Sequence, residues 1–138
     1  MPRIDFYILA AQGADARAQF SCTLATQAWR DGVNVHIITD DEPSAEHLDT
    51  LLWTFEPTSF TPHGRVSLKG QNPIVVSPNP QPGHLLINLT NATPGDWTER
   101  TQVAEIISAD EPTRQAGRDR YRQYQQAGAK PHTHHIDQ

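Results

Sequence analysis

The chain has 138 residues and a mass of 15.4 kDa, which suits one domain with a single hydrophobic core. Hydrophobic residues make up 36% of the sequence, a share that excludes wholesale disorder, and the net charge of −5 argues against a general nucleic-acid-binding protein. A single cysteine, Cys22, excludes an internal disulfide and a paired-cysteine zinc site. With so little cysteine, we expect a reduced, cytoplasmic protein, and because no apolar run is long enough to cross a membrane, we expect no membrane partner.

The first third of the chain predicts two strands separated by a helix. Residues 4–10 form a short apolar run typical of a buried strand, and residues 33–39 form a second such run. Between them, residues 15–31 show helical periodicity, and Gly32 follows as a helix stop. One face of this helix is apolar and comprises Ala18, Cys22, Ala25 and Trp29.

The middle of the chain predicts a second helix and two more strands. The helix opens at residues 40–43, where acidic side chains precede a proline, and it ends before Pro57. We expect an irregular loop over residues 56–72. Residues 73–77 and 84–90 then predict strands, with a proline-rich connection between them.

The last third predicts a strand, a polar helix and a loose end. Residues 103–107 form the strand, and the helix begins at residues 110–112 and stops at Gly128. We expect a single domain over residues 1–129 and a flexible C-terminal tail over residues 130–138.

This alternation of strands and helices predicts a three-layer α/β domain of Rossmann-like outline with a mostly parallel sheet. The sequence does not support a nucleotide site in it, because the first strand-to-helix turn has one glycine, Gly13, where a dinucleotide site needs three. No lysine-containing phosphate loop and no nucleophile-elbow serine motif occur, and Cys22 lies on the apolar helix face. We therefore expect no catalytic residue and no cofactor.

Histidines raise the question of a metal site. His132, His134 and His135 cluster near the C-terminus, but no zinc-binding spacing accompanies them, and a loose tail would not hold ligands in place. His63 suits a hydrogen-bonding loop residue better than a ligand. The acidic residues 40–42 suit a helix N-terminus better than a cation site. No metal site is predicted.

Two aromatic residues stand out near the middle of the chain. Residues 51–55 place four large apolar side chains within five helical positions, so Trp53 has to point partly away from the sheet. Phe60 follows in the predicted loop. Either these rings anchor a protein interface, or the loop folds back and covers them. Spacing alone leaves both interpretations open.

The C-terminal helix carries a basic stripe on an otherwise acidic chain. Arg114, Arg118 and Arg122 repeat at every fourth position, Tyr121 lies at the edge of the stripe, and Arg120 projects elsewhere. The stripe is either a solvated helix face or a binding surface. Forked guanidinium groups beside an aromatic ring suit carboxylate or phosphate recognition, and so small a stripe suits an acidic peptide better than a nucleic-acid duplex.

The sequence resembles the chi subunit of bacterial DNA polymerase III, an accessory subunit of the clamp loader. The resemblance runs over roughly residues 3–136, and its most specific segments are LLWTF at 51–55 and SFTPHG at 59–64. Further similar segments are FYIL (6–9), AWRDG (28–32), LLINL (85–89), EII (105–107) and GRDRYRQY (117–124).

The resemblance implies a non-catalytic adaptor in DNA replication that touches DNA only indirectly. The psi subunit, which links chi to the clamp loader, would bind at Trp53 and Phe60. The acidic C-terminal tail of single-stranded DNA-binding protein would bind at Ile107, Arg114, Arg118, Tyr121 and Arg122. One turn past Arg122, where the family can carry another basic residue, this chain has Gln125, so weaker binding of that tail is expected. The alternative to this adaptor function is a small α/β nucleotide-binding enzyme.

Overall fold

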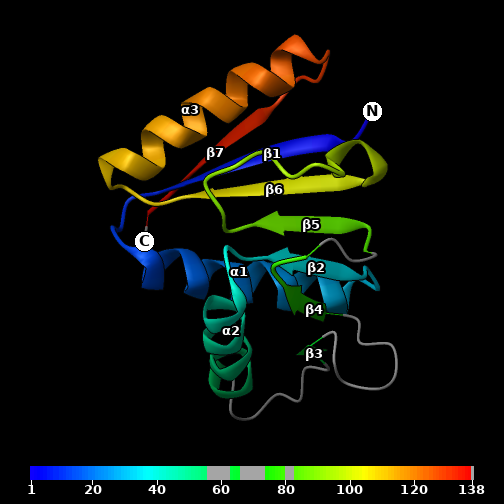
Figure 1. The fold of residues 1–138 in the computed structure, drawn as a ribbon, viewed down its shortest axis with the longest axis vertical. Helices are drawn as coiled ribbons and strands as arrows, with labels where there is room; N and C mark the ends of the chain where they lie inside the picture. The colour runs from blue at the N-terminus through cyan, green and yellow to red at the C-terminus, as the bar shows by residue number, and fades with distance from the viewer. Residues whose placement is uncertain (56–62, 66–73, 80–82, 138) are drawn as a thin grey trace.

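A computed structural model describes residues 1–55, 63–65, 74–79 and 83–137, which form a parallel β-sheet with helices on both faces (Figure 1). The described strands follow the order β3-β4-β2-β5-β6-β1-β7, and every neighbouring pair is parallel. This confirms the predicted three-layer α/β architecture. The helices are α1 (Ala14–Arg30), α2 (Glu42–Phe55), α3 (Glu111–Gln126) and the short 3-10 helix η1 (Trp97–Glu99). The strands are β1 (Arg3–Leu9), β2 (Val35–Ile38), β3 (His63–Arg65), β4 (Ile74–Ser77), β5 (Leu85–Asn88), β6 (Gln102–Ile107) and β7 (His132–Ile136).

The helices begin and end at the residues that the sequence marks. The Asp41 carboxylate accepts a hydrogen bond of 2.9 Å from the Ser44 amide and so caps the N-terminus of α2. Gly32 and Gly128 follow α1 and α3 with φ angles of 80° and 96°, a conformation that favours glycine. At both glycines, the backbone amides bond back to carbonyls of the last helical turn, which closes the helix.

The alternation of side chains along the strands builds a separate core on each face of the sheet. Helices α1 and α2 cover one face, where Cys22, Ala25 and Leu48 pack against Ile37 and Ile87. Helix α3 covers the other face (Figure 1), where Tyr124 packs against residues of β1, β5 and β6. The predicted burial of Cys22 is confirmed.

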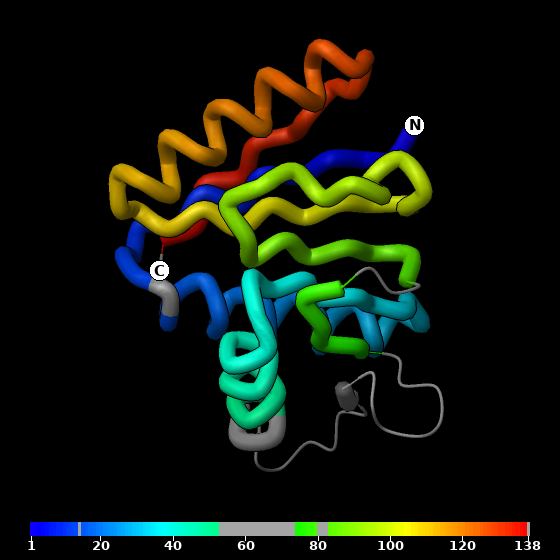
Figure 2. The backbone as a smooth tube through the Cα atoms, in the orientation of Figure 1, coloured from blue at the N-terminus to red at the C-terminus, as the bar shows by residue number. Residues whose placement is uncertain are grey.

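The C-terminal segment differs from its prediction as a loose tail. His132–Ile136 forms β7, which pairs with β1 at the edge of the sheet (Figure 2). Side chains hold this strand, since His134 Nε2 lies 2.9 Å from the Asp5 carboxylate and the His134 ring stacks on Tyr7 with centroids 4.9 Å apart. Burial alone would raise the pKa of the Asp5 carboxyl, but its hydrogen bonds, that from His134 first, hold the pKa below its usual range. A histidine-rich segment lacks the hydrophobic alternation from which strands are predicted.

The segment predicted as an irregular loop, residues 56–72, also differs in part. His63–Arg65 forms β3, which extends the sheet by pairing in parallel with β4. A three-residue strand is too short to show an alternating pattern in sequence. Residues 56–62 and 66–72 of that segment lie outside the described residues.

A buried carboxylate, Glu105 of β6, ties α3 to the sheet. Asn88 Nδ2 donates a hydrogen bond of 3.0 Å to Glu105 Oε1, and the Tyr124 hydroxyl donates one of 2.6 Å to Glu105 Oε2. Arg120 Nη2 lies 3.0 Å from Glu105 Oε1, as an ion pair in which no N–H is aligned for a hydrogen bond. All four side chains are buried. Arg120 does project away from the basic stripe, as predicted, and it enters the core beneath α3.

We predict that Arg120→Ala lowers the free energy of unfolding by about 3 kcal/mol or more, because it leaves the buried Glu105 carboxylate without its cation. Urea denaturation followed by circular dichroism would measure this loss. The matched control is Arg122→Ala, because Arg122 is exposed and a surface substitution changes stability by about 0.5 kcal/mol or less. Equal effects of the two substitutions would show that the Arg120–Glu105 pair does not hold α3.

Candidate functional site

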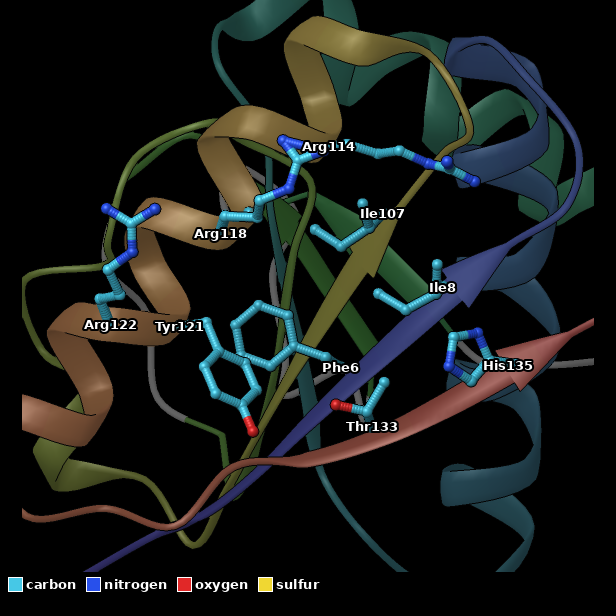
Figure 3. Close-up of a pocket in the computed structure, with 10 residues that line it drawn as sticks. Phe6, Ile8, Ile107, Arg114, Arg118, Tyr121, Arg122, Thr133 and His135 are labelled. Atoms are coloured by element: carbon cyan, nitrogen blue, oxygen red, sulfur yellow. The ribbon is translucent and has the colours of Figure 1, made fainter.

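A groove of about 470 Å³ lies between α3 and the strands β6, β1 and β7 (Figure 3). The parallel pairing of β1 with both β6 and β7 places alternate residues of three strands on one side, facing the helix. We call this feature the α3 groove. Its lining residues are Phe6, Ile8, Ile107, Arg114, Gly117, Arg118, Tyr121, Arg122, Thr133 and His135.

The floor of the α3 groove is apolar. Ile107 is buried at the end of β6, and Phe6 of β1 lies close to Tyr121 of α3, with ring centroids 5.1 Å apart. A Cβ atom at Gly117 would lie 2.8 Å from Ile107 Cδ1, so a side chain there would push the helix or the isoleucine away. Glycine thus allows α3 to approach the strand at the base of the groove.

The wall on the α3 side carries three arginines (Figure 3). The Arg118 guanidinium lies 3.1 Å from the Glu111 carboxylate, and that of Arg122 lies 3.9 Å from Asp119. Both contacts are exposed, and exposed ion pairs contribute little stability, so these guanidiniums can exchange them for carboxylates of a ligand. Arg114 is half-buried, and its Nε has no hydrogen-bond partner among the described residues.

The structure brings together all five residues that the sequence analysis assigned to one binding surface. They are Ile107, Arg114, Arg118, Tyr121 and Arg122, and each lines the α3 groove. The sequence analysis missed the remaining lining residues. Phe6 and Ile8 alternate along the first predicted strand, which indicates that they share one face of the sheet but not which helix packs on that face. Thr133 and His135 lie in the segment predicted as a tail. Gly117 gave no signal, because its close contact with Ile107 depends on the angle at which α3 crosses the sheet.

The second predicted surface comprises Trp53 and Phe60. Trp53 falls within α2, but its side chain lies outside the described residues, as does Phe60. The choice between an interface anchor and a covered ring therefore stays a prediction.

Residues 1–132 match the family described as "DNA polymerase III chi subunit, HolC". The chain belongs to this family. DNA polymerase III subunit chi of Pseudomonas aeruginosa is 35% identical over 139 residues, which cover 99% of this chain and 98% of that protein. The subunit chi of Escherichia coli is 30% identical over 141 residues, with 93% and 94% covered, and that of Haemophilus influenzae is 31% identical over 140 residues, with 95% of both covered. The resemblance stated from the sequence is confirmed, and membership in the chi family gives the protein an accessory role in DNA replication.

The fold of this chi-family chain also occurs in a larger protein. The crystal structure of T4 UvsW matches 98% of this chain and 41% of its own chain, with a TM-score of 0.70 and 10% sequence identity. At that identity, the likeness shows the fold alone.

The described part of this chi-family chain gives little support to a metal site, a membrane-spanning helix or a reactive cysteine. Within it, no three His, Cys, Asp or Glu side chains gather closely enough to hold a metal ion, and no helix is long and apolar enough to span a membrane. Burial raises the pKa of the Cys22 thiol to about 12, which leaves almost no thiolate near neutral pH. His134 is engaged with Asp5 rather than with its neighbouring histidines.

Proposed function

We propose that this protein is a non-catalytic adaptor that links the clamp loader, through psi, to the acidic C-terminal tail of single-stranded DNA-binding protein. The observation that carries the proposal is the α3 groove, in which an apolar floor adjoins three arginines. Membership in the chi family supports the setting, because it gives the protein a role in DNA replication. That role would be carried out in the cytoplasm.

The chemistry of the groove fits an acidic peptide that ends in an apolar residue and a free carboxylate, as such tails do. The apolar end would contact Ile107 and Phe6, with the Tyr121 ring as a side wall. Arg118 would pair with the terminal carboxylate as a fork, where a lysine would offer only a point charge. Arg114 and Arg122 would hold acidic side chains further along the peptide.

The ion pairs that the arginines already make set an upper limit on this affinity. A peptide carboxylate has to replace Glu111 at Arg118, and it gains only the difference between the two contacts. A short peptide also buries little surface, so we expect a dissociation constant on the order of micromolar. Salt screens exposed charges, so affinity falls between about 0.05 and 0.3 M salt.

The psi subunit would bind a different surface, at Trp53 and Phe60. This assignment is carried by the resemblance of the segments around residues 51–55 and 59–64 to the chi family. Trp53 lies in α2, which covers the opposite face of the sheet from α3 (Figure 1). Two partners on opposite faces could bind at the same time, as an adaptor requires.

The alternative, a nucleotide-binding enzyme, is less well supported at the turn where a phosphate would bind. There the Gly13 amide points to the Asp110 carboxylate at 3.5 Å, and a carboxylate in that place repels a phosphate. Hydrogen bonds, that from Ser108 first and then that from Thr113, hold the pKa of Asp110 well below its usual range, so it stays charged. Direct binding of DNA through α3 is disfavoured by the net charge of −5.

We predict that an acidic peptide with the composition of such a tail binds the wild-type protein and that Arg118→Ala weakens binding about tenfold or more. The loss leaves the terminal carboxylate unpaired next to an apolar floor, which is costly. Isothermal titration calorimetry at low salt would measure both dissociation constants.

The matched control for this titration is Arg30→Ala. Arg30 is an exposed arginine at the end of α1, on the other face of the sheet, so its removal changes the net charge equally. Binding of this variant should stay within about twofold of wild type. Equal losses in both variants would indicate a diffuse charge effect, and an absence of binding to wild type would remove the proposed function.

We predict that Trp53→Ala weakens the complex with psi roughly thirtyfold while leaving tail-peptide binding unchanged, because a central aromatic anchor contributes about 2 kcal/mol or more. Co-purification of psi with each variant would test this, and circular dichroism would confirm that the variant is folded. If Trp53→Ala instead unfolds the isolated protein, the ring belongs to the core and the psi assignment is wrong.

A further inference from the structure

The wall of the α3 groove opposite the arginines is formed by strand β7. Thr133 and His135 line the groove from this strand, next to Phe6 and Ile8 of β1. The register explains their placement, because Phe6 pairs with Thr133 and Ile8 pairs with His135 in the parallel ladder. Figure 3 shows His135 on the β7 side of the groove and Arg118 and Arg122 on the α3 side.

Because side chains alternate between the two faces of a strand, the adjacent His134 and His135 lie on opposite faces of the sheet. His134 points to the other face of the sheet, where it pairs with Asp5 and stacks on Tyr7. His135 is exposed, and its imidazole has no hydrogen-bond or ion-pair partner among the described residues. Its ring nitrogens are therefore open to a ligand that enters the groove.

The charged side chains that line the groove opposite His135 are all cations of α3, namely Arg114, Arg118 and Arg122. Helix α3 also contributes Gly117 and Tyr121 to the lining. Strands β1 and β6 contribute apolar side chains, and β7 contributes the neutral Thr133. The two acidic residues of α3, Glu111 and Asp119, are engaged with Arg118 and Arg122. Among the lining residues, therefore, no carboxylate neutralises His135 when it is protonated.

We propose that His135 is a further binding residue of the α3 groove, which adds a positive charge to it only when the imidazole is protonated. This inference rests on the proposed function, because the ligand is the same acidic peptide. An imidazole ordinarily titrates near pH 6.5, within the physiological range. Capture of the peptide would therefore depend on pH, whereas the arginine wall remains charged throughout.

The direction of this dependence follows from the charges. Carboxylates of a bound peptide favour a proton on an imidazole that they contact. Binding is therefore coupled to proton uptake, and affinity rises as the pH falls from about 8 to about 5.5. The peptide carboxylates ordinarily titrate near pH 4, so they stay charged across this range. One added exposed ion pair changes affinity by about threefold.

Calorimetric titration of an acidic, carboxylate-ended peptide into the full chain at about pH 5.5 and about pH 8 would test the proposal. Wild type should bind about threefold more tightly at the lower pH, and titrations in buffers of different ionisation enthalpy should reveal that protons are taken up on binding. In His135→Gln, both the affinity difference and this proton uptake should disappear.

His132→Gln serves as the control, because His132 is an exposed histidine of the same strand that does not line the groove. It should keep the pH dependence of wild type. A dependence that persists in His135→Gln, or equal wild-type affinity at both pH values, would overturn the role of His135 while leaving the proposed function intact. A wild-type protein that binds no peptide at either pH would overturn both.

Discussion

The position of α3 depends on a carboxylate that has no access to water. Glu105 lies on the inner strand β6, where its charge is balanced by Arg120 and its carboxylate oxygens accept hydrogen bonds from Tyr124 and Asn88. Two of these partners come from α3, four residues apart, so the contacts fix the rotation of the helix as well as its distance from the sheet. Breaking such a pair is far more costly than losing an exposed contact. The same rotation turns Gly117 onto Ile107 and directs Arg114 and the other stripe arginines to the groove.

The α3 groove is consequently built from two kinds of parts. Its floor belongs to the folded core, as the burial of Ile107 and the contact of Phe6 with Tyr121 show, so it exists before any ligand arrives. The cations at its rim are exposed and engaged only in contacts that solvent and salt weaken. A rigid apolar floor with an exchangeable charged rim favours recognition of a short, charged segment over a large folded partner. The proposed peptide binding would therefore be sensitive to salt and, through His135 of β7, to pH.

The order of the helices and most strands could be predicted from the sequence, because their signals are local. Asp41 and Gly128 mark helix ends by capping chemistry, and the basic stripe appears in the spacing of the arginines. The missing parts depend on contacts between distant segments. Strand β7 has no hydrophobic alternation and is held by the contact of His134 with Asp5, residues 129 positions apart. The pairing of Arg120 with Glu105 likewise depends on how α3 crosses the sheet, so the spacing placed Arg120 off the stripe but could not show that it enters the core.

Mapping of backbone amide chemical shifts would test most directly whether an acidic peptide occupies the α3 groove. The experiment titrates an acidic, carboxylate-ended peptide into isotope-labelled full-length protein. Binding of the peptide in the groove predicts that the largest shifts fall on the elements that line it, at Phe6, Ile107, Arg118, Tyr121 and His135. It also predicts that amides of α1 and α2, on the opposite face of the sheet, stay nearly unchanged. Shifts centred on α2, or spread evenly over exposed basic residues, would contradict it.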